Sequence, residues 1–255
     1  MGKSSQVKVK VLSNKNIKNS YWHMRLDAKG ISSLCLPGQF ISIKLGDNSQ
    51  PLLRRPFSIH GVCLNSIEIL YEVLGEGTRL LSGQKKGDVL DVIGPLGNGF
   101  ELVKQQSIIV AGGMGVAPLA FLAQKLKVAP LVIIGARAKD GILCEKEFKK
   151  LGCDVKIATD DGSAGFKGRV TDLLQDILRK THNTKYITLY ACGPKLMLRE
   201  IARVCSGNKI SGQLSLEAHM ACGIGACLGC VVKTSDGFKR VCKDGPVFTS
   251  QEIIW

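Results

Sequence analysis

The sequence has little of several features that mark other protein classes. Aromatic residues make up only 5% of its 255 residues, and its four histidines are isolated from one another. Proteins that bind single-stranded nucleic acids interleave aromatic with basic side chains. The scarcity of aromatics therefore argues against nucleic-acid binding, although the formal net charge is +14. Because the basic residues are scattered in short groups, we interpret most of them as solvated surface.

Long uninterrupted apolar runs are also missing. The most apolar stretch, residues 108–123, is broken by Gly112, Gly113, Gly115 and Pro118. A membrane-spanning helix needs roughly 20 consecutive apolar residues, so a strand, a turn and a helix explain this stretch better. The opening residues lack the apolar stretch of a signal peptide. We therefore expect a cytoplasmic protein without a transmembrane segment.

Two local patterns divide the chain. Up to about residue 100, short apolar stretches with alternation or β-branched residues are separated by turns rich in glycine, proline and asparagine. The stretches expected to be strands lie in Val7–Val11, Phe40–Ile43, Phe57–Ile59, Ile67–Val73 and Val89–Ile93. This pattern predicts a small antiparallel β-barrel.

After Gln106, apolar strands alternate with helical patterns. The expected strand–helix pairs are 107–111 with 117–126, 131–135 with 145–151, 155–158 with 170–179, and 186–191 with 195–205. Repeated alternation predicts a parallel sheet with right-handed crossovers and with ligand sites at the carboxyl ends of its strands. We expect a nucleotide-binding α/β domain.

The last segment, Gly212–Trp255, is rich in glycine and cysteine and has little helical periodicity. We expect its fold to depend on a metal. The sequence as a whole predicts a multi-domain β and α/β protein. Its predicted parts are an N-terminal antiparallel β-barrel at 1–102, a central parallel α/β domain at 103–209 and a small cysteine-rich C-terminal segment at 210–255.

The spacing of four of the ten cysteines is the strongest signal in the chain. Cys222, Cys227 and Cys230 form a C-x4-C-x2-C run, and Cys242 follows them. This arrangement is typical of plant-type [2Fe–2S] clusters, in which four thiolates hold two irons. Structural zinc is the alternative. Zinc ribbons usually pair two short cysteine knuckles, however, and only one half of this segment has that form.

The other six cysteines show no ligand spacing. In a reducing compartment a disulfide framework is not expected, so we interpret these cysteines as buried small apolar residues. They are Cys35, Cys63, Cys144, Cys153, Cys192 and Cys205. Cys192 is an exception, because Cys192-Gly193-Pro194 ends a predicted parallel strand, where such sheets place ligands.

Three short motifs suit nucleotide phosphates. Residues 112–118 lie between a predicted strand and helix, where glycines let the backbone approach a pyrophosphate. They do not match the full G-x-G-x-x-G fingerprint, and a tight turn explains them equally well by themselves. Arg55 and Ser58 could both contact a phosphate, although a structural surface arginine is the simpler reading. Gly75–Thr78 adds a flexible turn with a hydroxyl group.

Taken together, these motifs make the chain similar to the ferredoxin reductase superfamily. Within it, the chain resembles the electron-transfer subunits of class B dihydroorotate dehydrogenase, and the resemblance covers essentially the whole chain. Its motifs are R-x-x-S at Arg55–Ser58, G-x-G-T at Gly75–Thr78, G-G-x-G-x-A-P at Gly112–Pro118, C-G-P at Cys192–Pro194, the four cysteines, Leu216-Glu217 and Asp244–Phe248.

The resemblance implies FAD on the barrel and NAD on the second domain, and it assigns no catalytic acid or base. The residues implied for FAD are Arg55, Pro56, Phe57, Ser58, Leu70, Tyr71, Glu72, Gly77 and Thr78. Arg55 and Ser58 would lie on the pyrophosphate side, with residues 70–72 running past the flavin ring. The residues implied for NAD are Gly112, Gly113, Gly115, Pro118, Asp160, Cys192, Gly193 and Pro194. Cys222, Cys227, Cys230 and Cys242 would hold the cluster.

The choice of NAD over NADP depends on charges that follow the strands of the second domain. Asp160 and Asp161 follow the third strand, where carboxylates would repel the 2′-phosphate of NADP. Arg137, after the second strand, favours the opposite choice. We favour NAD.

The resemblance also implies a partner and a direction of electron flow. Dihydroorotate would reduce FMN on a separate catalytic subunit, and electrons would cross the cluster to FAD and then reach NAD as a hydride, in pyrimidine (UMP) biosynthesis. FAD would stand between the other carriers, because flavin exchanges both hydride and single electrons. A heterotetramer of two catalytic and two electron-transfer chains is implied, with the cluster segment facing the partner.

Two alternatives stay open at this point. The first is an enzyme of the same build, such as the flavin subunit of a ferredoxin:NADP oxidoreductase or of a sulfhydrogenase. The second is a non-catalytic binding module whose four cysteines hold zinc.

Overall fold

The computed structural model describes residues 4–46, 51–181 and 184–255. Its contacts group the chain into two compact units. The first unit comprises Met1–Gly99, Ala218–Val231 and Arg240–Pro246, and the second comprises Phe100–Glu217, Val232–Lys239 and Val247–Trp255. The three predicted domains do not coincide with these units one for one, because residues 210–255 contribute to both. The assignment of a separate function to each predicted domain stays a prediction.

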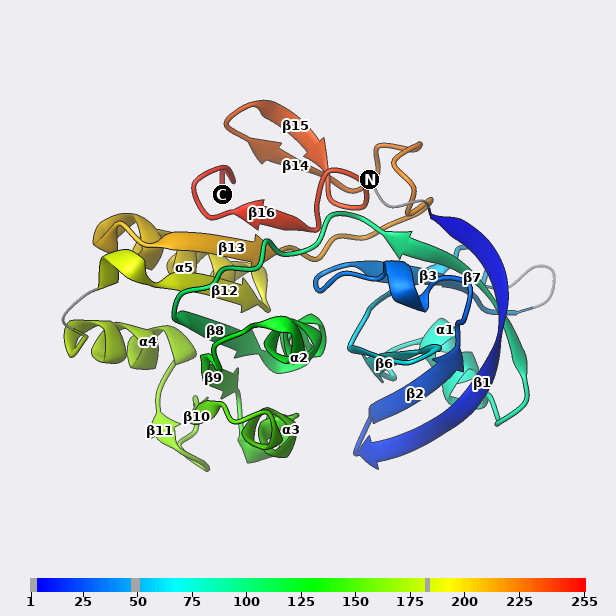
Figure 1. Ribbon diagram of the computed structural model, residues 1–255, viewed down its shortest axis with the longest axis horizontal. Helices are drawn as coiled ribbons and strands as arrows, with labels where there is room; N and C mark the ends of the chain where they lie inside the picture. Colours follow the sequence, from blue (N-terminus) through cyan, green and yellow to red (C-terminus); the bar gives the residue numbers. More distant parts are fainter. Residues whose placement is uncertain (1–3, 47–50, 182–183) are drawn as a thin grey trace. The chain divides into compact units, whose positions relative to one another are not determined.

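A seven-stranded antiparallel sheet forms most of the first unit (Figure 1), with strand order β4-β3-β7-β1-β2-β6-β5. Its strands are β1 (Ser5–Lys18), β2 (Tyr21–Asp27), β3 (Phe40–Lys44), β4 (Arg55–Ser58), β5 (Gly61–Cys63), β6 (Ser66–Glu72) and β7 (Val89–Leu96). A short helix, α1 (Glu76–Ser82), follows β6, and a 3-10 turn, η1 (Ser32–Leu34), precedes β3. The predicted antiparallel barrel is confirmed as a half-barrel.

The strand β2 is an element that the sequence analysis did not predict. Met24 and Leu26 are completely buried, while the residues between and beside them are partly exposed. This alternation is what a strand with one face on the core requires. The strand pairs with β1 on one side and with β6 on the other, so it is an interior strand of the sheet.

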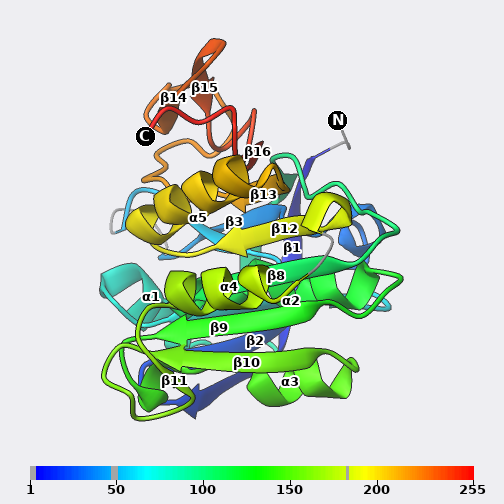
Figure 2. The ribbon, with the colours of Figure 1, turned by 90° about the vertical axis from the view of Figure 1, so that its left-hand side faces the viewer.

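The second unit contains a mostly parallel sheet with strand order β11-β10-β9-β8-β12-β13-β16 (Figure 2). Its strands are β8 (Ser107–Gly112), β9 (Leu131–Ala136), β10 (Asp154–Thr159), β11 (Phe166–Lys167), β12 (Thr188–Cys192), β13 (Ser211–Ser215) and β16 (Val247–Thr249). Only β16 runs antiparallel to its neighbour in this sheet. The two central strands, β8 and β12, are buried along their whole length. Burial on both faces is typical of parallel sheets.

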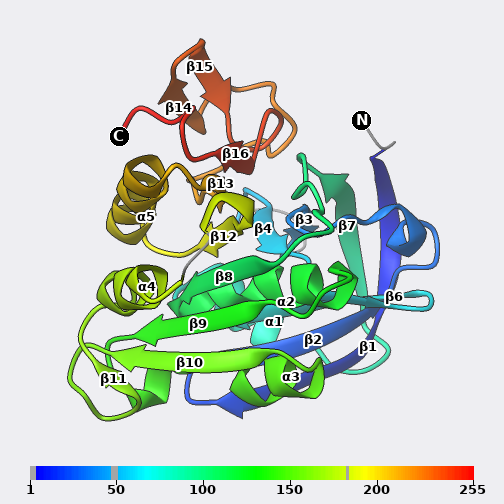
Figure 3. The same cartoon turned by 60° about the vertical axis from the view of Figure 1, so that its left-hand side comes forward.

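Helices cover both faces of this sheet (Figure 3). Contacts join α2 to α3 and α4 to α5. The helices are α2 (Val116–Lys125), α3 (Glu145–Lys150), α4 (Val170–Arg179) and α5 (Lys195–Asn208), and the 3-10 turns are η2 (Gly113–Gly115), η3 (Lys139–Gly141) and η4 (Thr184–Tyr186). The predicted alternation of strands and helices is confirmed, with bounds within a few residues of those expected.

The residues after 210 extend both units. The strand β13 pairs with β12, and β16 adds an edge strand beside it. A separate hairpin is formed by β14 (Val231–Thr234) and β15 (Gly237–Arg240). The described part of the chain contains no helix that could span a bilayer.

Candidate functional site

The four cysteines lie on two loops that both belong to the first compact unit. Cys222, Cys227 and Cys230 are on the loop 218–231, and Cys242 is on the loop 240–246. Backbone N–H groups point at three of the sulfurs. The donors are Ala226 and Cys227 to Cys222 Sγ (3.3 and 3.4 Å), Gly229 to Cys227 Sγ (3.4 Å) and Cys242 to Cys230 Sγ (3.4 Å).

The first cysteine loop can wrap so closely because of its unusual backbone. Gly223, Gly225 and Leu228 all have positive φ angles, of 68°, 84° and 59°. At Gly225 a Cβ atom would meet Cδ of Lys243 at 2.6 Å. Glycine at this position therefore supplies both the left-handed conformation and the space for the second cysteine loop.

The thiols fall into two pairs. A hydrogen bond joins the side chains of Cys222 and Cys227, and another joins those of Cys230 and Cys242. Burial opposes ionisation of Cys222, but hydrogen bonds from the backbone of Ile224, Cys227 and Ala226 outweigh it and lower the pKa of Cys222 to about 6. Burial and the neighbouring Cys230 raise the pKa of Cys242 to about 12. In the metal-free protein Cys222 therefore ionises more readily than an ordinary thiol.

The pairing of the thiols bears on which metal group fits. Two pairs of thiols, with N–H donors aimed at the sulfurs, suit a two-iron cluster that takes two thiolates on each iron.

Arg240 fastens the two cysteine loops together. Its Nε and Nη2 donate to the two carboxylate oxygens of Asp244 at 2.9 and 3.1 Å, and its Nη1 donates to the carbonyl of Gly225 at 3.1 Å. The Nδ2 of Asn98 donates to the carbonyls of Lys243 (3.2 Å) and Asp244 (3.0 Å). These side chains hold the loops in place without being ligands. The sequence analysis gave none of them a role, because hydrogen bonds to backbone carbonyls leave no spacing pattern.

The residues predicted for FAD come from three segments of the first unit. They lie on β4 (Arg55, Pro56, Phe57 and Ser58), at the end of β6 (Leu70, Tyr71 and Glu72) and in α1 (Gly77 and Thr78). The rings of Phe57 and Tyr71 meet edge to face, with centroids 5.8 Å apart. A Cβ on Gly77 would meet Nε of Arg55 at 3.1 Å. The structure therefore brings all three segments together, and glycine lets α1 approach the arginine.

The two neighbouring arginines have different environments. Arg54 is bound to Asp91, with its Nη2 2.6 Å from the carboxylate and its Nη1 2.9 Å from the backbone carbonyl. Arg55 instead donates to the carbonyl of Leu53 at 2.6 Å. Arg54 thus has a structural ion pair, which leaves Arg55 as the better phosphate ligand. The hydroxyl of Thr78 bonds within its own turn, to the backbone of Leu74 and Gly75.

The glycine turn predicted for NAD lies at the carboxyl end of the central strand β8. Gly112 ends that strand, Gly113 and Gly115 form η2, and Pro118 lies in the first turn of α2. Proline is tolerated there because the first N–H groups of a helix have no intrahelical partner. The turn requires glycine at its end, because a Cβ on Gly115 would collide with the carbonyl oxygen of Cys192.

The second NAD motif packs directly against this turn. Cys192 ends β12, which is the parallel neighbour of β8, and it pairs with Ala111 in the ladder. A Cβ on Gly193, whose φ is +157°, would meet Cα of Gly112 at 3.0 Å. With β9 and β10 on one side of β8 and with β12 on the other, the strand order reverses between β8 and β12. Open α/β sheets bind nucleotides at such a reversal.

Three acidic residues follow strands of this sheet. Asp160 directly follows β10, two strands away from β8, whereas the carboxylate of Asp161 accepts hydrogen bonds from Ser163 within its own turn. Glu217 is exposed, yet enough protein surrounds its carboxyl group to raise its pKa by desolvation. Burial, and secondarily the charge of Glu217, raise the pKa of the Cys192 thiol. The sequence analysis noted Glu217 only as part of a motif, without a role.

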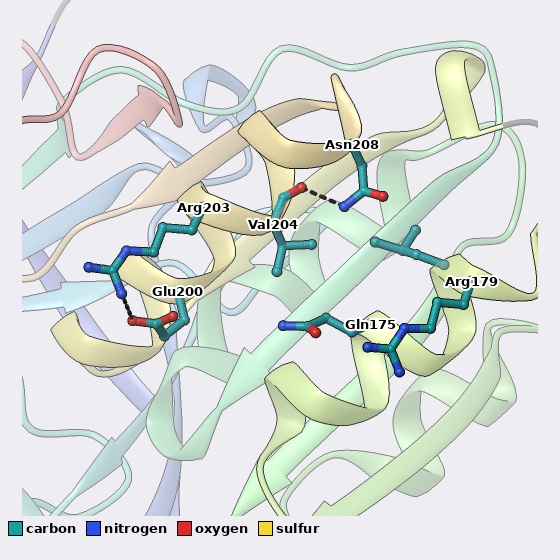
Figure 4. A pocket seen from close by; sticks show the side chains of 7 residues that line it. Gln175, Arg179, Glu200, Arg203, Val204 and Asn208 are labelled. Carbon is teal, nitrogen blue, oxygen red and sulfur yellow. Dashed lines mark hydrogen bonds and ion pairs between the residues drawn. The ribbon is translucent and has the colours of Figure 1, made fainter.

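A pocket between α4 and α5 has none of these residues in its lining (Figure 4). It has a volume of about 240 Å³ and includes Arg179 and Arg203 in its lining. Arg179 pairs with Asp176 and Arg203 with Glu200, each one helical turn away. With their charges offset by these acids, the arginines do not make this pocket a specific anion site.

Comparisons with known proteins agree with this arrangement. The family model described as oxidoreductase NAD-binding domain matches residues 109–203, which include the glycine turn and Cys192 to Pro194. The model described as iron-sulfur cluster binding domain of dihydroorotate dehydrogenase B matches residues 217–254, which include the four cysteines.

Two curated relatives are similar over almost their whole length. Both are named dihydroorotate dehydrogenase B (NAD(+)), electron transfer subunit. The one from Desulforamulus reducens is 43% identical, covering 96% of this chain and 97% of its own. The one from Caldanaerobacter subterraneus is 40% identical, covering 98% and 99%.

Solved structures give the same fold. The NADH-dependent reduced ferredoxin-NADP oxidoreductase is 30% identical with a TM-score of 0.86, covering 97% of this chain and 90% of that one. The ferredoxin reductase in carbazole 1,9a-dioxygenase, at 18% identity and a TM-score of 0.66 over 81% and 67% of the two chains, shows the fold alone. By its identity to the curated relatives, the chain belongs to the family of electron transfer subunits of dihydroorotate dehydrogenase B (NAD(+)).

Proposed function

We propose that this oxidoreductase subunit takes electrons from a partner subunit that oxidises dihydroorotate on FMN, and that it delivers them to NAD+ in pyrimidine (UMP) biosynthesis. The observation that best supports this is the composition of the first compact unit. It holds both cysteine loops together with all three segments predicted for FAD. A subunit that carries electrons from an oxidation on another protein to a nicotinamide would need both a single-electron site and a flavin site. Here one compact unit would hold both.

The cysteine loops support a [2Fe–2S] cluster held by Cys222, Cys227, Cys230 and Cys242. The thiols stand in two pairs, N–H groups point at the sulfurs, and Arg240 with Asp244 fixes the loops. These N–H dipoles and the guanidinium would stabilise the negative charge of the thiolate ligands.

The half-barrel supports FAD. Arg55 and Ser58 on β4 would contact the pyrophosphate, Gly77 and Thr78 would complete those contacts, and residues 70–72 would run beside the flavin ring. For Thr78 to reach a phosphate, its hydroxyl would have to exchange a bond within its own turn for one to the cofactor. Gly77 contributes by its lack of a side chain, because a Cβ there would press on Arg55.

The parallel sheet supports NAD at the reversal between β8 and β12. Gly112, Gly113, Gly115 and Pro118 would receive the pyrophosphate, and Cys192, Gly193 and Pro194 would border the nicotinamide. Asp160 at the end of β10 would disfavour a 2′-phosphate, which supports NAD over NADP. When bound, nicotinamide exchanges a hydride and a cluster exchanges single electrons, whereas flavin can exchange both. The chain's own residues would therefore bind and orient the cofactors and adjust their electronic properties. None of these residues needs to move a proton.

The curated relatives are named electron transfer subunits, which supports a partner that oxidises the organic substrate. The proposed partner is an FMN-containing catalytic subunit that holds the dihydroorotate site. We propose a complex of two catalytic and two electron-transfer chains.

One rival function is favoured by a specific observation. The NADH-dependent reduced ferredoxin-NADP oxidoreductase is 30% identical to this chain and matches nearly all of its fold. Such an enzyme would exchange electrons with ferredoxin in place of a dihydroorotate-oxidising subunit. The curated relatives at 40% identity and above favour the first function.

The test is anaerobic reduction of NAD+ by dihydroorotate. The catalytic subunit encoded in the same genome is assayed with and without this chain, after measuring its FAD, iron and acid-labile sulfide. We expect NAD+ reduction only when both chains are present, and a much weaker reaction with NADP+. If NADH reduces the bound flavin but dihydroorotate never delivers electrons, the dihydroorotate function is wrong and ferredoxin becomes the partner to test.

A further inference from the structure

The strand β1 changes its register just before Asn14. The ladder with β2 pairs Val11 with Leu26 and then Ser13 with Arg25, so the described pairing skips Leu12. A bulge of this kind places two residues of one strand opposite one residue of its partner, and it reverses which face the following side chains occupy. Bulges are common beside functional sites, where they redirect a side chain.

The bulge turns Asn14 toward the buried face of the sheet. Asn14 pairs with Met24 of β2, and Met24 pairs with Ile69 of β6. Met24 and Ile69 are completely buried. Tyr71 lies two residues beyond Ile69 and therefore on the same face of β6. Without the bulge, the amide of Asn14 would point away from Tyr71.

The side chain of Asn14 joins two segments that are distant in the sequence. Its Oδ1 accepts a hydrogen bond from the hydroxyl of Tyr71 at 2.9 Å. Its Nδ2 donates to the carbonyls of Leu81 (2.9 Å) and Gln84 (3.0 Å), with a longer contact to that of Ser82 (3.3 Å). The orientation of the amide is fixed by these partners, because three carbonyl oxygens could not face its oxygen.

The hydrogen bonds from the Asn14 amide matter most for α1, which has only seven residues. A helix this short is not stable by itself, and the last carbonyls of any helix lack intrahelical partners. Asn14 supplies a donor to Leu81 and Ser82 at the end of α1 and to Gln84 just beyond it. It thereby attaches the helix to the sheet.

We propose that Asn14 is a positioning residue for FAD. This inference rests on the proposed FAD site of the half-barrel. Asn14 links the strand that would run beside the flavin ring, through Tyr71, to the helix whose Gly77 packs against Arg55. Tyr71 in turn contacts Phe57 of β4. One amide therefore links two of the three segments that would bind FAD directly, and the third through Tyr71.

The experiment measures FAD affinity in the full-length chain with Asn14→Ala. The matched control is Asn16→Ala, because Asn16 is on the same strand and donates from its amide to the carbonyl of Asn19 at 2.7 Å, but it is exposed. Asn14→Asp replaces the alanine variant in these measurements if that variant does not fold. The aspartate keeps the shape of the side chain and the acceptor for Tyr71 but loses the N–H donors. Measurements are the FAD dissociation constant, the visible circular dichroism of bound flavin, and the unfolding temperature of the FAD-free protein.

We expect Asn14→Ala and Asn14→Asp to weaken FAD binding about tenfold or more, with an altered visible circular dichroism of the flavin that remains. Asn16→Ala should stay near wild type. Equal FAD affinity and equal flavin spectra in the Asn14 and Asn16 variants would overturn the inference while leaving the FAD site itself intact. A wild-type chain that binds no FAD would instead show that the proposed function is wrong, and the inference with it.

Discussion

Among the four cysteine residues of the site, Cys227 is the one that the structure leaves exposed. Its sulfur accepts one backbone hydrogen bond, from Gly229, and its partner Cys222 is the thiol that the loop prepares for ionisation. A hydroxyl in place of this thiolate is a poor ligand for iron. We expect Cys227→Ser to lose iron, acid-labile sulfide and the visible absorbance of a cluster.

The matched control is Cys63→Ser, which also replaces an exposed cysteine of the first unit but lies in β5. Iron and sulfide contents are measured on both variants after anaerobic purification. Loss of the cluster in both variants, or in neither, would contradict the assignment of Cys227 as a ligand.

Arg240 leads to a second prediction about a single residue. Its planar fork contacts both oxygens of Asp244 and also reaches Gly225, which a lysine ammonium group could not do. We expect Arg240→Lys to keep the cluster but to release iron to a chelator about tenfold faster, since such supporting residues typically change metal affinity by ten- to a hundredfold. Arg179→Lys, at an ion pair on α4, should leave the rate unchanged. Equal release from all three proteins would show that the fork does not hold the loops.

These residues show where prediction from the sequence ends at this scale. The cysteines are predictable because a cluster imposes a fixed spacing on its ligands. Asn14, Asn98 and Arg240 are not, because each contacts backbone carbonyls that any residue could supply. Arg54 and Arg55 are adjacent and identical in type, so only the structure could show that one of them pairs with Asp91.

At the scale of the elements, the pairing of β2 with β6 includes a partly buried ionic group. Glu68 on β6 lies 3.2 Å from Nε2 of His23 and 3.1 Å from Nε of Arg25, both on β2. The hydrogen bond from His23 is the main cause that lowers the pKa of Glu68. Burial acts in the opposite direction and raises the pKa, whereas the charges of His23, Arg25 and His60 lower it further. The folded protein therefore binds a proton at Glu68 less readily than the unfolded chain does.

The sign of the resulting pH dependence follows directly. Because its folded-state pKa lies below the ordinary value of 4.5, Glu68 contributes stability above pH 4.5, and this contribution is lost as the pH falls through the lower folded-state value. We expect Glu68→Gln to flatten the acid side of the stability profile, measured by urea unfolding at a series of pH values. Asp27→Asn, an exposed carboxylate at the end of β2, is the control. An acid side as steep as that of the wild type would refute this role.

The sequence predicted some elements better than others for physical reasons. The helix at 170–179 coincides with α4, because apolar residues at helical spacing meet a sheet on one side. The strand β2 was missed, since its few buried residues stand among aromatic and charged neighbours whose place is decided by pairing with β1 and β6. The strands β13 and β16 were also missed, because they lie in the segment rich in glycine and cysteine. These residues form strands because they pair with the edge of a sheet that earlier residues build.

At the scale of the whole molecule, the division of residues 210–255 between the two units could not be predicted from the change of pattern. The cysteine loops join the first unit through contacts such as those of Asn98 with the loop 240–246. The strand β16 joins the second unit through its pairing with β13. The proposed cluster and FAD sites thus lie in one unit, while the proposed NAD site lies in the other. Damage to one unit should therefore interrupt one half of the electron route and spare the other half.

Two variants can separate these halves in the assembled complex. Cys227→Ser should abolish reduction of NAD+ by dihydroorotate, because single electrons could no longer pass from the partner. It should retain oxidation of NADH by ferricyanide, which needs only the nicotinamide and flavin sites. Gly115→Ala should do the reverse, since its Cβ would meet the carbonyl of Cys192 and disturb the NAD turn at a cost of about 1–3 kcal/mol. Dihydroorotate should then still reduce ferricyanide but not NAD+. Loss of both reactions in both variants, with flavin still bound, would mean that the two units do not act as separate halves of the route.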